Sequence, residues 1–277
     1  MFFYCIYWAL IYTKGVMWSN SKDRGAQIRR LVVEMSHRSH SGETGSSLSI
    51  SDLLAVLYGK ILRVNPKKPN DSTRDRFILS KGHGAAALYA ALALRGFFSQ
   101  KLLLGYRVNN GTFHLHPSKG TAPGIEVSTG ALGHGLSIGV GMAYALKDTK
   151  SKVYVLIGDG ECNEGSIWEA ALSAGTLHLP NIVVIIDDNK FQGFGPTTKT
   201  NPFDLASQWK SFGWSVLRVD GHNTKAIEKA FGTAAKAKKP TVIIADTVSG
   251  KGIPAIERTL GAHYYIAKTE DVAALKK

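Results

Sequence analysis

The chain has 277 residues, of which 44% are hydrophobic and 20% are charged. This composition excludes an intrinsically disordered chain, and the length suffices for one large buried core. Lys and Arg number 34 against 21 Asp and Glu, a formal charge of +13 that favours anionic ligands or acidic partners. Because no long basic run is interleaved with aromatic residues, we expect no nucleic-acid partner.

The two cysteines and the first residues of the chain indicate the cellular compartment in which we expect the protein. Cys5 and Cys162 are the only cysteines and form no CxxC motif, so we expect neither disulfides nor zinc, and a cytoplasmic protein. The apolar start is shorter than the ~20 residues of a membrane helix and lacks the basic region of a signal peptide. We therefore expect no membrane segment, an N-terminal extension of unclear role over residues 1–20, and a single domain over residues 21–277.

The first part of the chain predicts helices joined by polar loops. Apolar residues at helical spacing predict three helices, over residues 22–37, 53–62 and 85–96. Polar and glycine-rich stretches predict loops over residues 41–47 and 65–75. A short apolar run at 77–80 predicts a buried strand that leads into a glycine turn. Residues 105–130 show little periodicity, and a loop of that length inside a domain is usually functional.

The rest of the chain alternates between strand and helix patterns. Continuous apolar, β-branched runs predict strands over residues 153–158, 181–187, 214–220 and 240–248. Helical patterns fall at residues 136–147, 166–177 and 223–237. This alternation predicts an α/β fold, with a parallel sheet and helices on both of its faces.

Polar clusters follow two of these predicted strands. Gly158-Asp159-Gly160 comes directly after the first, and Asp187-Asp188-Asn189 after the second. Ligands of open parallel sheets bind at the carboxyl ends of the strands, where these clusters meet. Carboxylate and amide oxygens suit Mg²⁺ that takes its remaining ligands from a diphosphate, and glycine lets the backbone approach phosphates. Gly-Asp-Gly alone is often an ordinary turn, so the second cluster carries much of the argument.

At this point the sequence resembles a known family. The segment GDGECNEGSIWEAALSAGTLHLPNIVVIIDDNKFQ resembles the thiamine diphosphate motif of transketolases. Three further segments resemble the same family in the same order: RDRFILSKGHGAAALYAAL, HPSKGTAPGIEVSTGALGHGLSIGVGMA and VDGHN. The resemblance covers residues 22–265 and is closest to the N-terminal, diphosphate-binding subunit of transketolases encoded as two chains. It implies the thiamine diphosphate-binding fold and, as cofactors, thiamine diphosphate and Mg²⁺.

The resemblance also implies roles for individual residues. Mg²⁺ would be held by the side chains of Asp159 and Asn189 and by the backbone carbonyl of Phe191. The cofactor would lie against His83, Gly130, Leu132, Gly158, Asp159, Gly160, Glu164 and Asn189. Glu164 and Glu169 would also point to a dimer interface. Candidates for catalytic contact with the substrate are Glu43, His83, His116 and His263.

Each role has a simpler alternative that the sequence leaves open. His83 could cap a helix at a strand–helix turn. Glu164 could be a carboxylate stabilised by the positive end of a helix dipole.

The chain departs from the family pattern in three places. The family's second domain, which supplies a carboxylate to the aminopyrimidine, does not follow, so we expect a C-terminal partner subunit with the pyrimidine-binding domain and an α2β2 assembly. Glu43 stands where the family has histidine, and Ala262-His263-Tyr264 replaces Trp-His-Gly. Both changes flank the substrate side, so we expect a sugar or sugar-phosphate substrate from a specialised pathway.

The resemblance therefore implies a transketolase-like transferase that moves a two-carbon ketol unit from a ketose to an aldehyde. Two alternatives remain open. The chain could serve another thiamine diphosphate reaction, such as transfer of a pyruvate-derived acyl unit to a sugar aldehyde. It could also be a scaffold subunit that has lost catalysis and only binds its partner.

Overall fold

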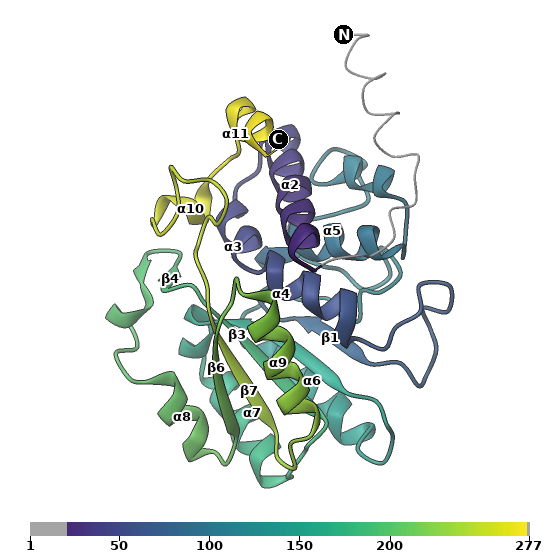
Figure 1. Ribbon diagram of the computed structural model, residues 1–277, viewed down its shortest axis with the longest axis vertical. Helices are drawn as coiled ribbons and strands as arrows, with labels where there is room; N and C mark the ends of the chain where they lie inside the picture. The colour runs from purple at the N-terminus through teal and green to yellow at the C-terminus, as the bar shows by residue number, and fades with distance from the viewer. Residues whose placement is uncertain (1–20, 276–277) are drawn as a thin grey trace.

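The computed structural model describes residues 21–275, so the N-terminal extension expected over residues 1–20 lies outside the described residues. A five-stranded parallel sheet forms the centre, in the order β1-β2-β3-β7-β6 (Figure 1). Its strands are β1 (Arg76–Leu79), β2 (Val153–Gly158), β3 (Ile182–Asp188), β6 (Ser215–Asp220) and β7 (Thr241–Asp246). A small antiparallel pair, β4 (Phe191–Gln192) and β5 (Gly195–Pro196), follows β3.

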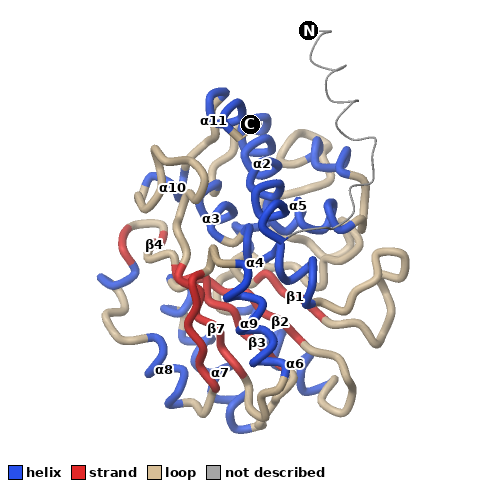
Figure 2. The backbone as a smooth tube through the Cα atoms, viewed as in Figure 1, coloured by secondary structure: helices blue, strands red, loops and turns tan. Residues whose placement is uncertain are grey.

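Helices cover both faces of this sheet (Figure 2). One face packs on α2 (Ser21–Ser39), α4 (Ser51–Val56), α5 (Ala85–Arg95) and α9 (Thr224–Ala235). The other packs on α6 (His134–Ala145), α7 (Gly165–Thr176) and α8 (Leu205–Ser211). Because neighbouring residues of a strand point to opposite faces, Leu156 of β2 enters the first core and Val155 the second. The predicted α/β class is confirmed.

The prediction of a loop over residues 41–47 was wrong in its second half. Helix α3 spans Thr44–Ser49, and its residues are all buried. A Cβ on Gly45 would lie 2.5 Å from the carbonyl oxygen of Ala262, so only glycine permits this close approach. Packing against a distant segment thus forms a helix where the local composition favours a loop. That segment continues through α10 (Gly261–Tyr264) to α11 (Thr269–Ala274).

The end of the second predicted helix also differs from a regular α-helix. After α4 the chain continues as a π-helical turn over Leu57–Ile61. The long loop is confirmed in its main part, because residues 106–133 contain turns and one isolated bridge from Tyr106 to Phe113. Its backbone returns to the sheet at Thr129, whose hydroxyl donates to the carbonyl oxygen of Leu79 at 2.7 Å.

The strand register places the polar clusters side by side. Gly158 at the end of β2 pairs with Asp187 on β3, so the residues that follow both strands leave the sheet at one edge.

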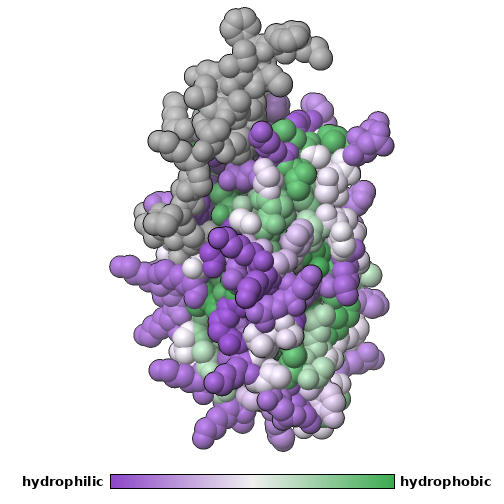
Figure 3. Space-filling view, turned by 90° about the vertical axis from the view of Figure 1, so that its right-hand side faces the viewer, coloured by the Kyte–Doolittle hydropathy of each residue, from purple (hydrophilic) through white to green (hydrophobic). Residues whose placement is uncertain are grey.

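Figure 3 shows hydrophilic side chains projecting between smaller apolar areas on one side of the molecule. Within residues 21–275, no helix combines the length and the apolarity that crossing a membrane requires.

Candidate active site

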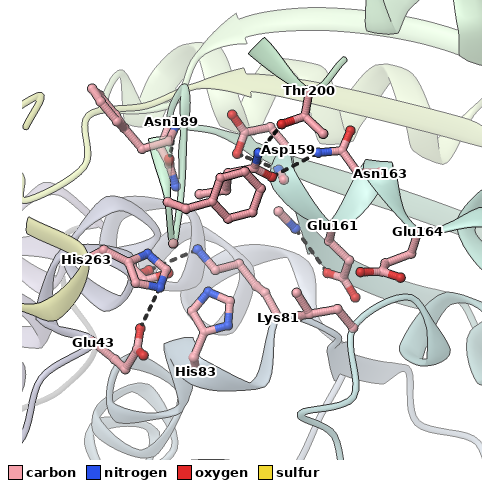
Figure 4. A pocket seen from close by; sticks show the side chains of 18 of the residues that line it. Glu43, Lys81, His83, Asp159, Glu161, Asn163, Glu164, Asn189, Thr200 and His263 are labelled. Carbon is pink, nitrogen blue, oxygen red and sulfur yellow. Dashed lines mark hydrogen bonds and ion pairs between the residues drawn. The ribbon is translucent and has the colours of Figure 1, made fainter. Parts of the chain in front are cut away.

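A cavity of ≈ 450 Å³ opens at the carboxyl ends of β2 and β3 (Figure 4). It is lined by every residue predicted to contact the metal, the cofactor or the substrate: Glu43, His83, His116, Gly130, Leu132, Gly158, Asp159, Gly160, Glu164, Asn189, Phe191 and His263. Glu169, expected at an interface, lies exposed on α7 and is not among the lining residues. The fold therefore gathers residues from several separate segments into one site.

Asp159 lies at the start of the turn that follows β2. Its Oδ1 accepts a hydrogen bond from the backbone of Gly160 at 2.9 Å. Its Oδ2 accepts from the backbone of Lys190 at 2.8 Å and from the hydroxyl of Thr197 at 3.0 Å. Burial, together with the charges of Asp187 and Asp188, raises the pKa of the Asp159 carboxyl to about 7. A bound cation would remove this penalty by compensating the negative charge.

Asn189 presents its amide oxygen on the neighbouring strand end. Its Nδ2 donates to Oδ2 of Asp187 at 2.9 Å, while its Oδ1 accepts from the backbone of Phe191 at 3.0 Å. The first bond fixes which end of the amide carries the oxygen. In the described part of the chain no three His, Cys, Asp or Glu side chains converge as a metal cage. A hard cation held here would thus take further oxygens from a ligand, as Mg²⁺ does with phosphates.

Two positions in the cavity wall require glycine. Gly130 has φ +138°, and a Cβ there would lie 2.8 Å from the His116 ring. A Cβ on Gly160 would lie 2.8 Å from Cβ of Gln192. Because both glycines line the cavity, side chains at these positions would take up part of its space, so the glycines keep it open for a ligand. The residues present therefore fit a diphosphate and its cation.

Lys81 lines the cavity but was not among the predicted site residues. Its Nζ lies 2.5 Å from Oδ2 of Asp187, and also donates to the carbonyl oxygen of Ser46 at 3.2 Å. Burial alone would raise the pKa of the Asp187 carboxyl, but the Lys81 charge and hydrogen bonds hold it below its usual value. The available signal was a lysine inside a buried glycine turn, opposite a carboxylate at a strand end, because a buried charge requires a partner.

Glu161 is a second residue that the sequence pattern did not reveal. Its Oε1 accepts from the Ser80 hydroxyl at 2.5 Å and from the backbone of Gly133 at 2.8 Å, and its Oε2 accepts from the backbone of Gly158 at 3.2 Å. Burial raises the pKa of this carboxyl, although these three donors oppose the shift. Glu161 thereby fastens the end of the long loop to the ends of β1 and β2.

Three histidines give the cavity neutral imidazoles. Burial lowers the pKa of His116, and it lowers the pKa of His263 with a further contribution from the Lys81 charge. The pKa of His83 lies well below its usual value, because of burial first and then the neighbouring Lys81 and the other two histidines. The His83 and His263 rings lie 5.6 Å apart. Neutral imidazoles can both donate and accept hydrogen bonds.

Comparison with known proteins agrees with this geometry. Residues 21–277 match the family model described as the thiamine diphosphate-binding domain of transketolase. The chain is 42% identical to the 6-deoxy-6-sulfo-D-fructose transketolase subunit of Clostridium sp. (strain MSTE9), over 85% of this chain and 87% of that protein. It is 41% identical to an apulose-4-phosphate transketolase subunit from Phocaeicola vulgatus, over 87% of each protein.

A solved structure agrees in three dimensions. The transketolase from Leishmania mexicana superimposes with a TM-score of 0.89 at 29% identity, over 93% of this chain and 41% of that one. This chain thus spans less than half of that transketolase, whereas it covers most of the two subunits named above. The chain therefore belongs to the transketolase family and corresponds to its N-terminal, thiamine diphosphate-binding part.

Proposed function

We propose that the chain is the diphosphate- and Mg²⁺-binding subunit of a two-subunit enzyme that transfers a two-carbon ketol unit from a ketose to an aldehyde. The observation that carries the proposal is that Asp159 and Asn189 follow adjacent strands and line one cavity, which Gly160 helps to keep open. Asp159, Asn189 and the carbonyl of Phe191 would hold Mg²⁺, and His83 and Gly160 would contact the diphosphate. Thiamine diphosphate supplies, when bound, the nucleophilic carbon and the electron sink for carbon–carbon bond cleavage.

The remaining cavity residues suit the handling of a sugar. Neutral His83, His116 and His263 can donate hydrogen bonds to sugar oxygens or accept protons from them. Burial of the site strengthens these polar contacts because the local dielectric constant is low. The buried Lys81–Asp187 ion pair holds the floor of the cavity in place.

A second subunit is part of the proposal. Two relatives are named as transketolase subunits and have lengths similar to this chain. We propose that a C-terminal subunit carries the pyrimidine-binding domain, that the assembly is α2β2, and that it works in the cytoplasm. Glu164 is exposed at the edge of the cavity, where it could meet a partner.

The substrate belongs, on this proposal, to a specialised sugar pathway. The two named relatives act on sugars with a sulfo or phosphate group, according to their names. Glu43, which stands in place of the family histidine, lines the same cavity as Asp159. Glu43 differs from the family residue on the substrate side, whereas Asp159 and Asn189 on the metal side match the family. This combination supports an enzyme that keeps the thiamine diphosphate chemistry and acts on a different sugar.

The test is reconstitution with a protein of the same organism that matches a transketolase C-terminal half, sought first in the genes beside this one. The pair, with thiamine diphosphate and Mg²⁺, is supplied with aldehyde acceptors and, as donors in parallel, ketose phosphates, sulfo-ketoses or pyruvate, and products are identified by mass spectrometry. Products longer than the acceptor by a two-carbon ketol unit support the proposal. Transfer of an acetyl unit from pyruvate instead, or stable association without any transfer, would contradict it.

A further inference from the structure

The two strand ends that carry the proposed Mg²⁺ ligands are tied together by one short hairpin. Asp159 follows β2 on one side, whereas Asn189 follows β3 and Phe191 begins the hairpin on the other. Strands β4 and β5 turn the chain back, because Phe191 pairs with Pro196 in an antiparallel register. The next residue, Thr197, thereby reaches Asp159, and its hydroxyl donates to Oδ2 of that carboxylate at 3.0 Å.

The backbone of Thr197 is fixed on both sides. Its N–H donates to the carbonyl oxygen of Lys190 at 3.1 Å and so closes the hairpin. Its carbonyl oxygen accepts from the N–H groups of Thr200 and Asn201 at 3.0 and 2.9 Å. The residue is buried, and its Cγ2 lies 3.7 Å from the position that a Cβ on Gly160 would take. The Thr197 hydroxyl is therefore held against the turn that follows β2.

The carboxylate of Asp159 is bonded unequally at its two oxygens. Oδ2 accepts from the backbone of Lys190 at 2.8 Å as well as from the Thr197 hydroxyl. Oδ1 accepts from the backbone of the adjacent Gly160 at 2.9 Å. Because each carboxylate oxygen has two lone pairs, both lone pairs of Oδ2 are used and one lone pair of Oδ1 is left. Among residues 21–275, Thr197 supplies the only side-chain donor to this carboxylate.

We infer that Thr197 is a positioning residue for the proposed metal site. Its hydroxyl fixes the rotation of the Asp159 carboxylate, so that Oδ1, which keeps a lone pair, is the oxygen offered to the cation. The same hydroxyl joins Asp159 to the hairpin that carries the other two proposed ligands, and it therefore holds both sides of the site in one unit. The inference rests on the proposed function and adds to it the residue that orients the charged ligand.

The experiment replaces the hydroxyl of Thr197 by a methyl group of similar size. The Mg²⁺ concentration for half-maximal binding of thiamine diphosphate is measured by calorimetry on the reconstituted complex. Thr197→Val should raise this concentration about 10- to 100-fold, the usual effect of removing a group that orients a metal ligand. Thr197→Ser keeps the hydroxyl and should stay within about threefold of the wild type. At saturating Mg²⁺, the ketol-transfer rate of Thr197→Val should return to within about threefold of the wild-type rate.

A matched control and a second probe complete the test. Thr233→Val removes a hydroxyl that bonds a carbonyl oxygen on the exposed face of α9, outside the cavity lining, and should leave the Mg²⁺ dependence unchanged. With Mn²⁺ in place of Mg²⁺, the electron paramagnetic resonance spectrum of the bound ion should change in Thr197→Val but not in Thr197→Ser. Where Thr197→Val does not fold, Thr197→Cys takes its place in both measurements, because a thiol is a weak donor.

The outcomes separate this inference from the proposed function. If Thr197→Val has the Mg²⁺ dependence of the wild type, or loses turnover at saturating Mg²⁺ with that dependence unchanged, the positioning role is wrong and the proposed function stands. If the wild-type complex binds no thiamine diphosphate at any Mg²⁺ concentration, the proposed function is wrong as well.

Discussion

Lys81 Nζ lies 2.5 Å from Oδ2 of Asp187, with 1% and 0% of the two side chains exposed. The pair connects the glycine turn after β1 with the end of β3, across the end of β2 between them. The same carboxylate oxygen also accepts from the amide of Asn189. One ion pair thus supports both the floor of the cavity and the orientation of the Asn189 amide.

Removing the lysine should therefore destabilise the chain strongly. Lys81→Met leaves the Asp187 carboxylate buried without its cation, which typically costs about 3–5 kcal/mol. Urea unfolding, followed by circular dichroism, measures the change. The double variant Lys81→Met/Asp187→Asn should recover part of the loss because no buried charge remains. Equal stability of the single variant and the wild type would show that the pair contributes nothing.

Asp159→Asn should weaken cofactor binding far more than it affects folding. The substitution removes the one negative charge that the proposal gives to Mg²⁺ at this position, and we expect a loss of thiamine diphosphate affinity on the order of 10²-fold in the presence of Mg²⁺. Calorimetry on the reconstituted complex measures it. The matched control is Asp204→Asn, which changes the exposed cap of α8 and should leave affinity unchanged. Unchanged affinity in Asp159→Asn would remove this residue from the site.

Two glycines of α6 provide a matched test of packing. A Cβ on Gly135 would overlap Oγ of Ser80 and lie 2.7 Å from Cα of the same residue, so Gly135→Ala must push the helix away from β1. We expect a loss of about 1–3 kcal/mol. A Cβ on Gly141, in the same helix, meets nothing within 4 Å, and Gly141→Ala should stabilise by about 0.5–1 kcal/mol. Similar effects of both substitutions in thermal unfolding would contradict this account of the packing.

Asp52 links three elements near the same edge of the sheet. Its carboxylate lies 2.8 Å from Arg29 of α2 and 2.8 Å from Nδ1 of His222. Nε2 of His222 accepts from the backbone of Val248 at 2.9 Å, so the proton of the neutral ring is on Nδ1 and is donated to Asp52. The Asp-Gly-His turn, recognised only as a family motif in the sequence, is therefore a structural tie between α4 and the end of β7.

This tie predicts a pH dependence of stability. Burial alone would raise the pKa of the Asp52 carboxyl, but the bonds from His222 and Arg29 outweigh burial and lower it. A carboxyl whose pKa is lower in the folded than in the unfolded protein stabilises the fold at pH values above its unfolded-state pKa of about 3.9. This stabilisation is lost as the pH falls through the folded-state pKa. Asp52→Asn should thus lose about 1–3 kcal/mol near neutral pH.

The difference between wild type and Asp52→Asn should stay constant down to roughly pH 5 and shrink below about pH 4. Guanidinium unfolding at a series of pH values measures it for both proteins. A difference that grows on acidification would mean that the carboxylate is destabilised in the folded state, opposite to what its two bonds indicate.

The order of strands and helices could be predicted because the local spacing of apolar residues differs between buried strands and helices. Residues 153–158 and 181–187 are buried on both faces, and buried parallel strands have the continuous apolar runs that reveal them. The residues at their ends followed from topology, since Gly158 and Asp187 pair in register. That Asp159 and Asn189 line one cavity could be predicted, because polar residues directly after adjacent parallel strands meet at one edge of the sheet.

What escaped prediction depends on contacts between distant segments. Helix α3 forms because Gly45 packs on Ala262, a contact that no local pattern contains. Lys81 and Asp187 are 106 residues apart. A lysine in a glycine turn signals a cation that needs a partner, but neither sequence neighbourhood says which residue that partner is. Glu161 was overlooked because its partners include backbone N–H groups of other loops, which every sequence has.

The central claim is a cofactor site shared between two subunits, and calorimetric titration of thiamine diphosphate with Mg²⁺ tests it most directly. The titration is made into the purified chain, into the candidate partner and into their complex. We predict tight binding to the complex, at least tenfold weaker binding to the chain alone, and loss of binding to the complex made with Asp159→Asn. Binding to the chain alone as tight as to the complex would contradict the shared site, and no binding to a demonstrated complex would contradict the cofactor itself.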